Sequence, residues 1–233
     1  MDGVLLVDKP AGPTSHDIVD RIRRTFRLAK VGHGGTLDPA ATGLLMILTG
    51  RGTKLSNYFL GSDKTYAGTL QLGVTTDSYD ADGRVTREAD WRGVTREQLE
   101  ARFRALTGDQ LQMPPMVSAV KINGVPLYKS ARRGEEIERK PRLVHIYEFR
   151  LLDFQPPEAG FVVRCTKGTY VRALCHDVGE ALGCGAHLKQ LRRTQSGEFD
   201  VRDALPLDAL LALSPAELQL RILPLNRFGR AAG

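Results

Sequence analysis

Apolar residues near the start of the chain follow first a strand pattern and then a helix pattern. The run GVLLVDK at residues 3–9 predicts a short buried strand that ends in a turn rich in proline and glycine. Thr14 and Asp17 then have the spacing of a helix cap, and Ile18 and Ile22 recur on one helical face. The chain is therefore predicted to begin with a strand followed by an amphipathic helix.

The same patterns continue toward the centre of the chain. GLLMIL at residues 43–48 predicts a second buried strand, and Thr53 is expected to cap a short helix that extends through Leu60. Residues 64–73 alternate between apolar and polar positions, as a half-buried strand does. Further on, the pair Asn123-Gly124 predicts a hairpin turn.

Two more helices are predicted beyond residue 90. Thr95 and Gln98 cap the first, which Gly108 ends, and the second runs from Thr169 to a stop at Gly183. The strands do not alternate regularly with the helices. The predicted fold class is therefore α+β, with mostly antiparallel pairing.

Length and composition are those of a globular protein. The 233 residues can bury a full core in one large domain, or in one domain with an insertion. The longest apolar run is too short to span a bilayer, and no signal-peptide pattern opens the chain. Cys165, Cys175 and Cys184 match no zinc motif and are expected to be unpaired thiols in a reducing compartment. We therefore expect a cytoplasmic protein.

Positive charge is concentrated in three stretches. The formal net charge is +6 and the pI is near 9.4. The stretches are DRIRRTFRLAK at residues 20–30, YKSARRGEEIERKPR at 128–142 and HLKQLRR at 187–193. Any one of them is typical of a solvated helix face, whereas the three together favour a polyanionic partner. Charge alone does not distinguish DNA from RNA.

The stretch VGHGGTLDPAATGLL, at residues 31–45, places a single acid in an open backbone. Most Asp-Pro pairs in loops are turn chemistry, but Gly32, Gly34 and Gly35 are more glycines than one turn needs. Pro39 restricts the backbone of Asp38 directly before it. An open loop that is locally stiff suits a positioned nucleophile.

Other catalytic arrangements are less well supported. Paired-acid hydrolysis needs a second carboxylate, and the candidates Asp77, Asp80 and Asp82 lie in a stretch that resembles a turn or supporting loop. His33 and His176 have no recognisable metal-ligand spacing. Neither a phosphate-binding loop nor a full dinucleotide fingerprint is present in the sequence. We expect a reaction that uses no metal and no cofactor.

Cys175-His176-Asp177 suggests a thiol hydrolase at first sight. On the predicted helix these neighbours point in different directions and Cys175 faces inward, which favours a buried thiol.

Arg172 and Tyr66 extend the candidate site. Arg172 falls in the first turn of a predicted helix, where the helix dipole disfavours a cation, so an anion is expected beside it: a phosphate or the Asp38 carboxylate. Tyr66 begins an inward-facing row in which Gly68 leaves space, and an aromatic ring at the rim of a cleft can stack on a base. Together with Asp38 these residues indicate attack on one nucleoside of a nucleic acid.

Six motifs follow one another along the chain: GVLLVDKPAGPTSHD, GHGGTLDPAATGLL, KTYAGTLQLG, TTDSYDADG, KGTYVRALCHDVGEALGCGAHLKQLRR and SGEF. On these motifs the chain resembles the TruB family of tRNA pseudouridine synthases from about residue 3 to residue 205. The resemblance implies isomerisation of uridine to pseudouridine at position 55 in the T loop of tRNA. It also implies the pseudouridine-synthase fold, a mixed and largely antiparallel sheet flanked by helices and loops with a central RNA-binding cleft.

The resemblance also implies roles for individual residues. Asp38 attacks the ribose, either at C1′ or through a glycal, Arg172 pairs with Asp38, and Tyr66 packs on the flipped uracil and takes the C5 proton. The residues implied to bind or support the substrate are His33, which enters the T loop, Tyr170, which shapes the pocket, Asp80 near the substrate, and Lys9 and Leu191, which support the core.

The domain organisation follows from the same resemblance. Residues 1–205 are expected to form the catalytic domain, with a basic mobile insertion at about 111–142 that grips the T stem-loop. The 28 residues from 206 to 233 are too few for the PUA-type RNA-binding domain that many bacterial members carry, so recognition is expected to rest on the T arm.

The family usually has a threonine where Gly34 stands. We expect a monomer that binds tRNA and no membrane; the alternatives are a synthase for another RNA and a non-catalytic RNA-binding or chaperone module.

Overall fold

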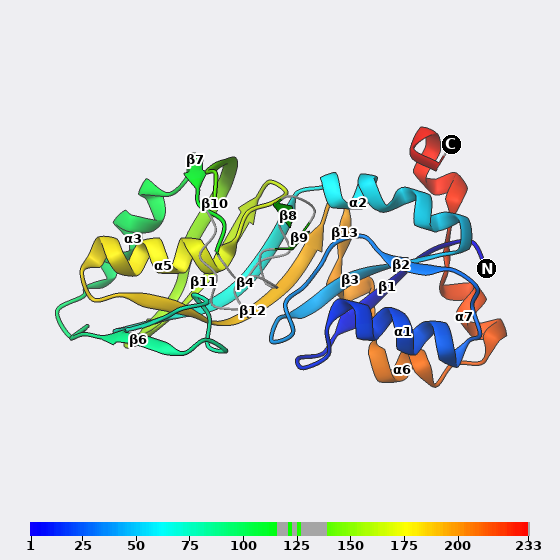
Figure 1. Ribbon diagram of the computed structural model, residues 1–233, viewed down its shortest axis with the longest axis horizontal. Helices are drawn as coiled ribbons and strands as arrows, with labels where there is room; N and C mark the ends of the chain where they lie inside the picture. Colours follow the sequence, from blue (N-terminus) through cyan, green and yellow to red (C-terminus); the bar gives the residue numbers. More distant parts are fainter. Residues whose placement is uncertain (116–120, 123–124, 127–138, 233) are drawn as a thin grey trace. The chain divides into compact units, whose positions relative to one another are not determined.

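The described part of the chain folds into two compact units. Unit 1 contains residues 1–66 and 191–233, and unit 2 contains residues 67–190. Strands β4 (Lys64–Leu72) and β12 (Ala186–Ser196) have residues in both units. The computed structural model describes residues 1–115, 121–122, 125–126 and 139–232 (Figure 1).

In unit 1 the sheet is built around β1 (Gly3–Lys9). This strand pairs antiparallel with β3 (Thr42–Thr49) along its whole length, so that Lys9 lies opposite Gly43. Short strands complete the sheet: β14 is parallel and β15 antiparallel to β1, while β2 is antiparallel and β12 parallel to β3, and β13 is antiparallel to β12. Their bounds are Val31–His33 for β2, Phe199–Asp200 for β13, Leu205–Pro206 for β14 and Leu223–Pro224 for β15. This mixed pairing confirms the predicted α+β class.

Both faces of β1 and β3 are buried, because alternate residues enter two separate hydrophobic layers. Leu5 and Val7 pack with helices on one face of the sheet. Val4 packs on the other face with Phe59 and Phe228. The first layer is covered by α1 (Ser15–Thr25), α6 (Leu207–Leu211) and α7 (Pro215–Arg221), and the second by α2 (Ser56–Gly61) and the 3-10 helix η3 (Leu225–Ala232).

Unit 2 places two helices on a long hairpin. The strands β10 (Arg142–Gln155) and β11 (Glu158–Cys165) pair antiparallel, and β7 (Gly108–Gln112) pairs with β10. The ring of Phe103, on α3, stacks on Phe149 with 3.9 Å between ring centroids, and Phe161 meets Phe149 edge-on. The other elements of this unit are β5 (Val74–Thr76), β6 (Val85–Glu88), β8 (Lys121–Ile122), β9 (Val125–Pro126), α3 (Arg96–Ala105) and α5 (Val171–Leu182).

The predicted helix ends are confirmed in three cases. Thr14 and Thr95 close capping boxes with Asp17 and Gln98, at the starts of α1 and α3. At the end of α5, Gly183 adopts the left-handed conformation with a φ of 80°, as a C-terminal glycine does.

The predicted cap at Thr53 is wrong. Thr53 lies inside the 3-10 helix η1 (Gly50–Leu55), where its hydroxyl donates to the carbonyl of Gly50 at 2.9 Å. The hydroxyl is therefore hydrogen-bonded within η1 and does not cap α2, which begins at Ser56.

The end of the described chain is ordered by short helices and a strand. After a short 3-10 helix, η2 (Val201–Asp203), two helices follow, and β15 pairs with the start of β1. Leu210 and Leu218 from these helices are fully buried in the same layer as Leu5. These residues belong to unit 1 together with residues 1–66.

The predicted basic insertion at about 111–142 lies largely outside the described residues. Within it, strands β8 and β9 pair antiparallel, and the predicted Asn123-Gly124 turn lies outside the described residues. None of the described helices has the length and apolar character needed to cross a membrane.

We predict that Gly34→Ala destabilises unit 1, because the packing there leaves no room for a side chain. A Cβ at Gly34 would lie 2.5 Å from the Cβ of Phe59 and 3.2 Å from that of Met46. Overpacking of this kind costs about 1–3 kcal/mol. Chemical denaturation measures the loss. Gly61→Ala, at a position with no atom within 4 Å of the added Cβ, is the control. Equal stability of Gly34→Ala and the control would contradict this account.

Candidate active site

Asp38 is half-buried in the loop that connects β2 to β3. Backbone hydrogen bonds hold the loop at several points: the Gly34 N–H donates to the Met46 carbonyl at 2.9 Å, and the Gly12 N–H donates to the Pro39 carbonyl at 2.9 Å. The Ser15 hydroxyl, at the start of α1, both accepts from the Leu37 N–H at 2.9 Å and donates to the Leu37 carbonyl at 3.1 Å. The loop is therefore open in composition but fixed in position, as the sequence predicts.

Lys9 binds the loop from the end of β1. Its side chain is completely buried, and Nζ donates to the carbonyls of Pro10 at 2.9 Å, Pro39 at 3.0 Å and Ala41 at 2.7 Å. Burial lowers the pKa of Lys9 to about 8, while the negative charge of Asp38 opposes that fall. A side chain with no exposed surface is suited to the expected support of the core, and the part that Lys9 has in the site stays a prediction.

Arg193 binds the same loop from β12. It is 2% exposed, and Nε donates to the Leu44 carbonyl at 2.7 Å. The two terminal nitrogens donate to the carbonyls of Thr36 at 3.4 Å and Gly35 at 3.2 Å. Arg193 belongs to the basic stretch at residues 187–193, but it is buried, because consecutive residues of a strand point to opposite sides.

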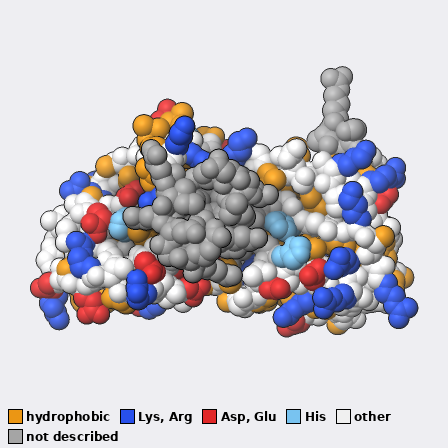
Figure 2. All heavy atoms as spheres, in the orientation of Figure 1, with side chains coloured by type: hydrophobic (Ala, Val, Ile, Leu, Met, Phe, Trp, Pro, Cys, Tyr) orange, Lys and Arg blue, Asp and Glu red, His pale blue; other side chains and the backbone are white. Residues whose placement is uncertain are grey.

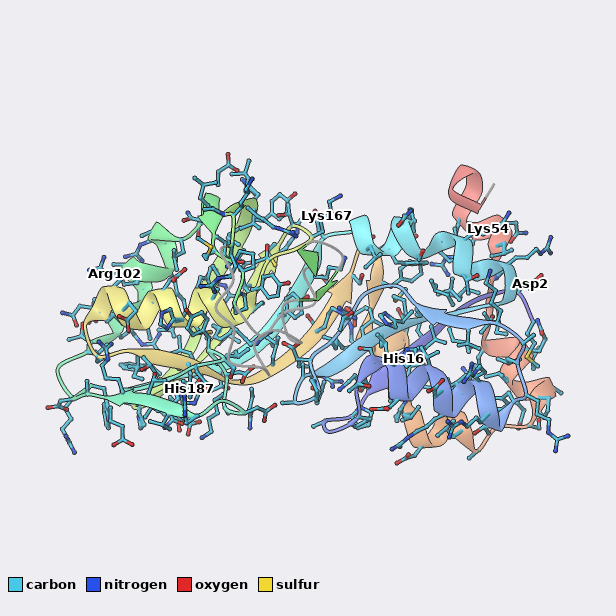
Figure 3. The ribbon with its side chains drawn as sticks, in the orientation of Figure 1. Asp2, His16, Lys54, Arg102, Lys167 and His187 are labelled. Atoms are coloured by element: carbon cyan, nitrogen blue, oxygen red, sulfur yellow. The ribbon has the colours of Figure 1, made fainter. Side chains whose placement is uncertain are left out.

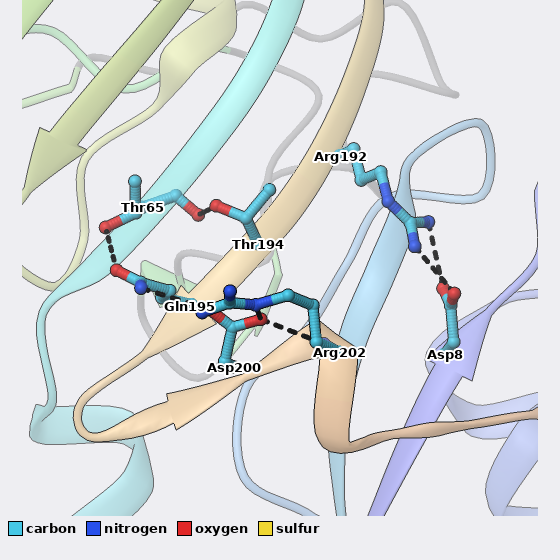
Figure 4. A network of polar contacts seen from close by, with 7 residues as sticks. All are labelled: Asp8, Thr65, Arg192, Thr194, Gln195, Asp200 and Arg202. Carbon is cyan, nitrogen blue, oxygen red and sulfur yellow. Dashed lines mark hydrogen bonds and ion pairs between the residues drawn. The ribbon is translucent and has the colours of Figure 1, made fainter.

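The neighbouring Arg192 points away from the loop into a different set of contacts. Its guanidinium binds the Asp8 carboxylate through two nitrogens, at 2.9 and 2.6 Å (Figure 4). Further along β12, Thr194 and Gln195 bond to Thr65 on β4. Arg192 is therefore paired with an acid, whereas the contacts that tie Arg193 to the loop are with backbone carbonyls.

His33 ends β2, directly before the glycine-rich loop. Its Nδ1 accepts from the Gly35 N–H at 3.4 Å, which places the proton of the neutral ring on Nε2. Burial lowers the pKa of His33, and the charges of His16 and Arg193 lower it further. The ring is therefore neutral at physiological pH. Leu191, also of unit 1, is half-buried, and its carbonyl accepts from the Thr42 hydroxyl at 3.5 Å.

Tyr66 lies half-buried on β4, as predicted, but the space expected beside it at Gly68 is filled. A Cβ at Gly68 would be 2.5 Å from the ring of Phe161 and 3.0 Å from the Gln190 carbonyl oxygen. The absence of a side chain at Gly68 therefore leaves room for the ring of Phe161, in the unit 2 core, and not for a ligand.

Arg172 is bound within unit 2 by the loop that contains Asp80. It is 4% exposed, with one terminal nitrogen 3.2 Å from the Asp80 carboxylate and 3.1 Å from the Ser78 carbonyl oxygen. Asp80 is itself held by the Ser78 hydroxyl at 2.5 Å. A carboxylate thus offsets the unfavourable position of a cation in the first turn of α5. Sequence reasoning missed this pair because its members lie far apart along the chain.

Tyr170 immediately precedes α5 and is fixed through its backbone. Its N–H donates to Gln112 Oε1 at 2.7 Å, and its carbonyl accepts from Gln112 Nε2 at 3.0 Å. The ring centroid lies 6.0 Å from Cζ of Arg172. Tyr170, Arg172 and Asp80 are therefore brought together in unit 2, while Asp38, Lys9, His33, Tyr66 and Leu191 belong to unit 1. The pairing of Asp38 with Arg172 joins residues of the two units and stays a prediction.

The thiol-hydrolase alternative does not fit the described surroundings of Cys175. This thiol is completely buried, and burial raises its pKa far above the physiological range. The neighbouring His176 stacks on the Tyr79 ring with 3.9 Å between centroids. The three cysteines are free and buried, as the sequence predicts.

Cationic side chains cover parts of the surface of unit 1. Lys and Arg side chains are spread over the region of α1 (Figure 2), whose exposed residues include Arg21, Arg23 and Arg24. His16 is exposed on the same helix, and Lys54 lies on η1 (Figure 3). This surface is suited to contact with phosphate groups.

Comparison with known proteins identifies relatives along nearly the whole chain. Residues 23–171 match the model of the TruB family pseudouridylate synthase N-terminal domain, and residues 172–228 match that of the tRNA pseudouridylate synthase B C-terminal domain. A tRNA pseudouridine synthase B from Opitutus terrae is 51% identical over 96% of this chain and 93% of its own. One from Bordetella avium is 49% identical over 94% of this chain and 91% of its own.

Solved structures show the same fold. A chain of a Cbf5-Nop10-Gar1 complex matches with a TM-score of 0.75 and 30% identity over 95% of this chain and 60% of that chain. A chain of an H/ACA RNP bound to a substrate RNA containing 2′-deoxyuridine matches with a TM-score of 0.68 and 28% identity, over 90% of this chain and 52% of that chain. The present chain thus spans about half to three-fifths of the length of these structural neighbours.

We predict that the buried ammonium of Lys9 makes stability depend on pH between about 8 and 10.5. The pKa of Lys9 is about 8 in the folded protein and has its ordinary value of 10.5 when unfolded. The unfolded state therefore binds more protons in this window, and the free energy of unfolding gains from Lys9 as the pH rises through it. We expect wild type to gain about 1–2 kcal/mol over Lys9→Met between pH 7.5 and 10, less than the full shift implies because part of the titration lies outside this window. Urea denaturation measures this difference, and a difference that is the same at both pH values would contradict the prediction.

Proposed function

The chain belongs to the TruB family of pseudouridylate synthases and isomerises uridine to pseudouridine in tRNA; we propose that its target is uridine 55 of the T loop and that Asp38 is its nucleophile. The observation that supports Asp38 most is its loop, which Lys9 and Arg193 hold by backbone carbonyls on both sides of the acid. A nucleophile fixed before the substrate binds loses little entropy in reaching the attacking geometry.

The reaction needs one carboxylate and no outside reagent. The target base leaves its stack, at a cost of a few kcal/mol that contacts to the RNA offset. Asp38 then acts on the ribose, either at C1′ or by removing the C2′ proton to form a glycal, and the N1–C1′ bond breaks. The detached uracil turns and is rejoined through C5, the C5 proton is lost, and N1 gains a proton. Because the product is an isomer of the substrate, the reaction needs neither an oxidant nor a reductant.

Side chains around the acid have distinct roles in this proposal. Tyr66 packs on the flipped uracil and takes the C5 proton, while Arg172 pairs with Asp38 and keeps it ionised. Asp80 orients Arg172 through the ion pair at 3.2 Å. Tyr170, fixed by Gln112, shapes the pocket wall.

Recognition of the T arm rests on groups in both units. His33 enters the T loop as a neutral ring, since burial lowers its pKa, and a neutral ring loses less hydration free energy than a charged one when it stacks among bases. Leu191 supports the core of the site. The insertion at about 111–142 grips the T stem-loop. The enzyme acts as a monomer in the cytoplasm, in keeping with its three free thiols.

Asp38→Asn is expected to abolish isomerisation while leaving tRNA binding within about threefold of wild type. An amide has nearly the shape of the carboxylate but is a far weaker nucleophile and base, and loss of a covalent nucleophile lowers the rate by at least about 1000-fold. Tritium release from unmodified tRNA labelled at uridine C5 measures the rate, and mapping of pseudouridine along the product identifies the position. Wild-type turnover by Asp38→Asn would remove Asp38 from the mechanism, and pseudouridine at a position other than 55 would overturn the proposed target.

A second prediction concerns the pairing of Arg172 with Asp38. Removing the guanidinium in Arg172→Met lets the Asp38 carboxylate protonate more readily, so the acid limb of the pH–rate profile moves to higher pH. Arg172→Lys keeps a positive charge and shifts the limb less. Arg102→Met, at an exposed arginine on α3, is the control (Figure 3). If Arg172→Met slowed the reaction without moving the acid limb, its role would lie elsewhere than in the charge state of Asp38.

A further inference from the structure

The loop that carries Asp38 begins at a gap in the pairing along one edge of β3. β2 follows this edge as far as the pair His33 and Ile47, after which the Gly34 N–H donates to the Met46 carbonyl. β12 joins the same edge only at Thr42 and Gly43. The Leu44 carbonyl lies between the two strands, and the Arg193 side chain donates to it at 2.7 Å. Arg193 thus completes the hydrogen bonding of β3 where the loop leaves the sheet.

The same guanidinium reaches the chain just before the nucleophile. It donates to the carbonyls of Gly35 and Thr36, three and two residues before Asp38. Lys9 binds the carbonyls of Pro39 and Ala41, one and three residues after it. Both flanks of Asp38 are therefore held by buried cations from two different strands of unit 1.

The positive charges of Lys9 and Arg193 also affect the acid, beyond holding the loop in place. Buried cations are costly unless an anion or several dipoles offset them. Within the described part of the chain, Lys9 and Arg193 donate hydrogen bonds to backbone carbonyls. Asp38, the one acid in the stretch from residue 31 to 45, brings a negative charge whose attraction favours the charged form of Lys9. The same arrangement that fixes the loop also surrounds the acid with positive charge.

We propose that Arg193 is a positioning residue for the isomerisation: with Lys9 it fixes the carbonyls on both sides of Asp38 and so sets the orientation of that carboxylate. This inference rests on the proposed role of Asp38 as the nucleophile. Arg193 does not touch the substrate in this account, and it acts through the loop. Its loss therefore affects the chemical step far more than tRNA binding.

Single-turnover kinetics on unmodified tRNA, together with tRNA affinity and thermal stability, test the proposal. We expect Arg193→Gln to lower the single-turnover rate by about 100-fold, the effect of a misplacement near 1 Å, while the Kd for tRNA stays within about threefold. Arg193→Lys keeps the charge but not the fork of donors, and is expected to recover about tenfold of that loss. If Arg193→Gln does not fold, the Lys variant carries the test, with a rate about tenfold below wild type and unchanged affinity.

Two controls separate positioning from loss of stability and from failure of the proposed mechanism. Leu210→Ala removes a fully buried side chain of α6 and lowers thermal stability without touching the loop. It is expected to keep the wild-type single-turnover rate below its melting temperature. A wild-type rate in a folded Arg193 variant, or an equal rate loss in Leu210→Ala, would overturn the positioning role. Wild-type turnover by Asp38→Asn would instead overturn the proposed nucleophile, so the two failures are distinguishable.

Discussion

A single glycine, Gly43, allows three strands to meet where the catalytic loop rejoins the sheet. Lys9 of β1 lies opposite Gly43 on one side, and Arg193 of β12 lies opposite it on the other. Any Cβ at this position would be 2.3 Å from the Arg193 carbonyl oxygen, and the φ of 101° is one that residues with side chains rarely adopt. The absence of one side chain therefore brings two buried cations to the same register, and the loop is built on them.

This arrangement explains why one acid is surrounded by so open a backbone. Gly35 presents one of the bound carbonyls with a φ of 144°, a conformation that residues with side chains rarely adopt. The stiffness comes from Lys9 and Arg193, and Pro39 adds to it by restricting Asp38. Directly before Lys9 and Arg193 in the chain, Asp8 and Arg192 neutralise each other in an ordinary ion pair. The contrast shows that the charge of Arg193 is directed at the loop.

Much of the fold could be predicted from the sequence, and the failures share a physical cause. The capping residues Thr14 and Thr95 act locally, within one turn, so that their spacing is sufficient to find them. β10 and β12 were not predicted, because charged residues interrupt the apolar pattern of both strands. The candidate site shows the same division. Asp38 is a candidate from the composition of its own loop, whereas the ion pair of Arg172 with Asp80 and the contacts of Arg193 join residues that are distant in the sequence.

In the free enzyme the Arg193 side chain is held on the loop of Asp38. The most direct test is hydrogen exchange at Arg193 Nε–H, followed by NMR on protein labelled with ¹⁵N arginine. We expect this proton to exchange much more slowly than the Nε–H of the exposed Arg21 on α1, because it is buried and bonded to the Leu44 carbonyl at 2.7 Å. Exchange at Arg193 as fast as at Arg21 would contradict this arrangement.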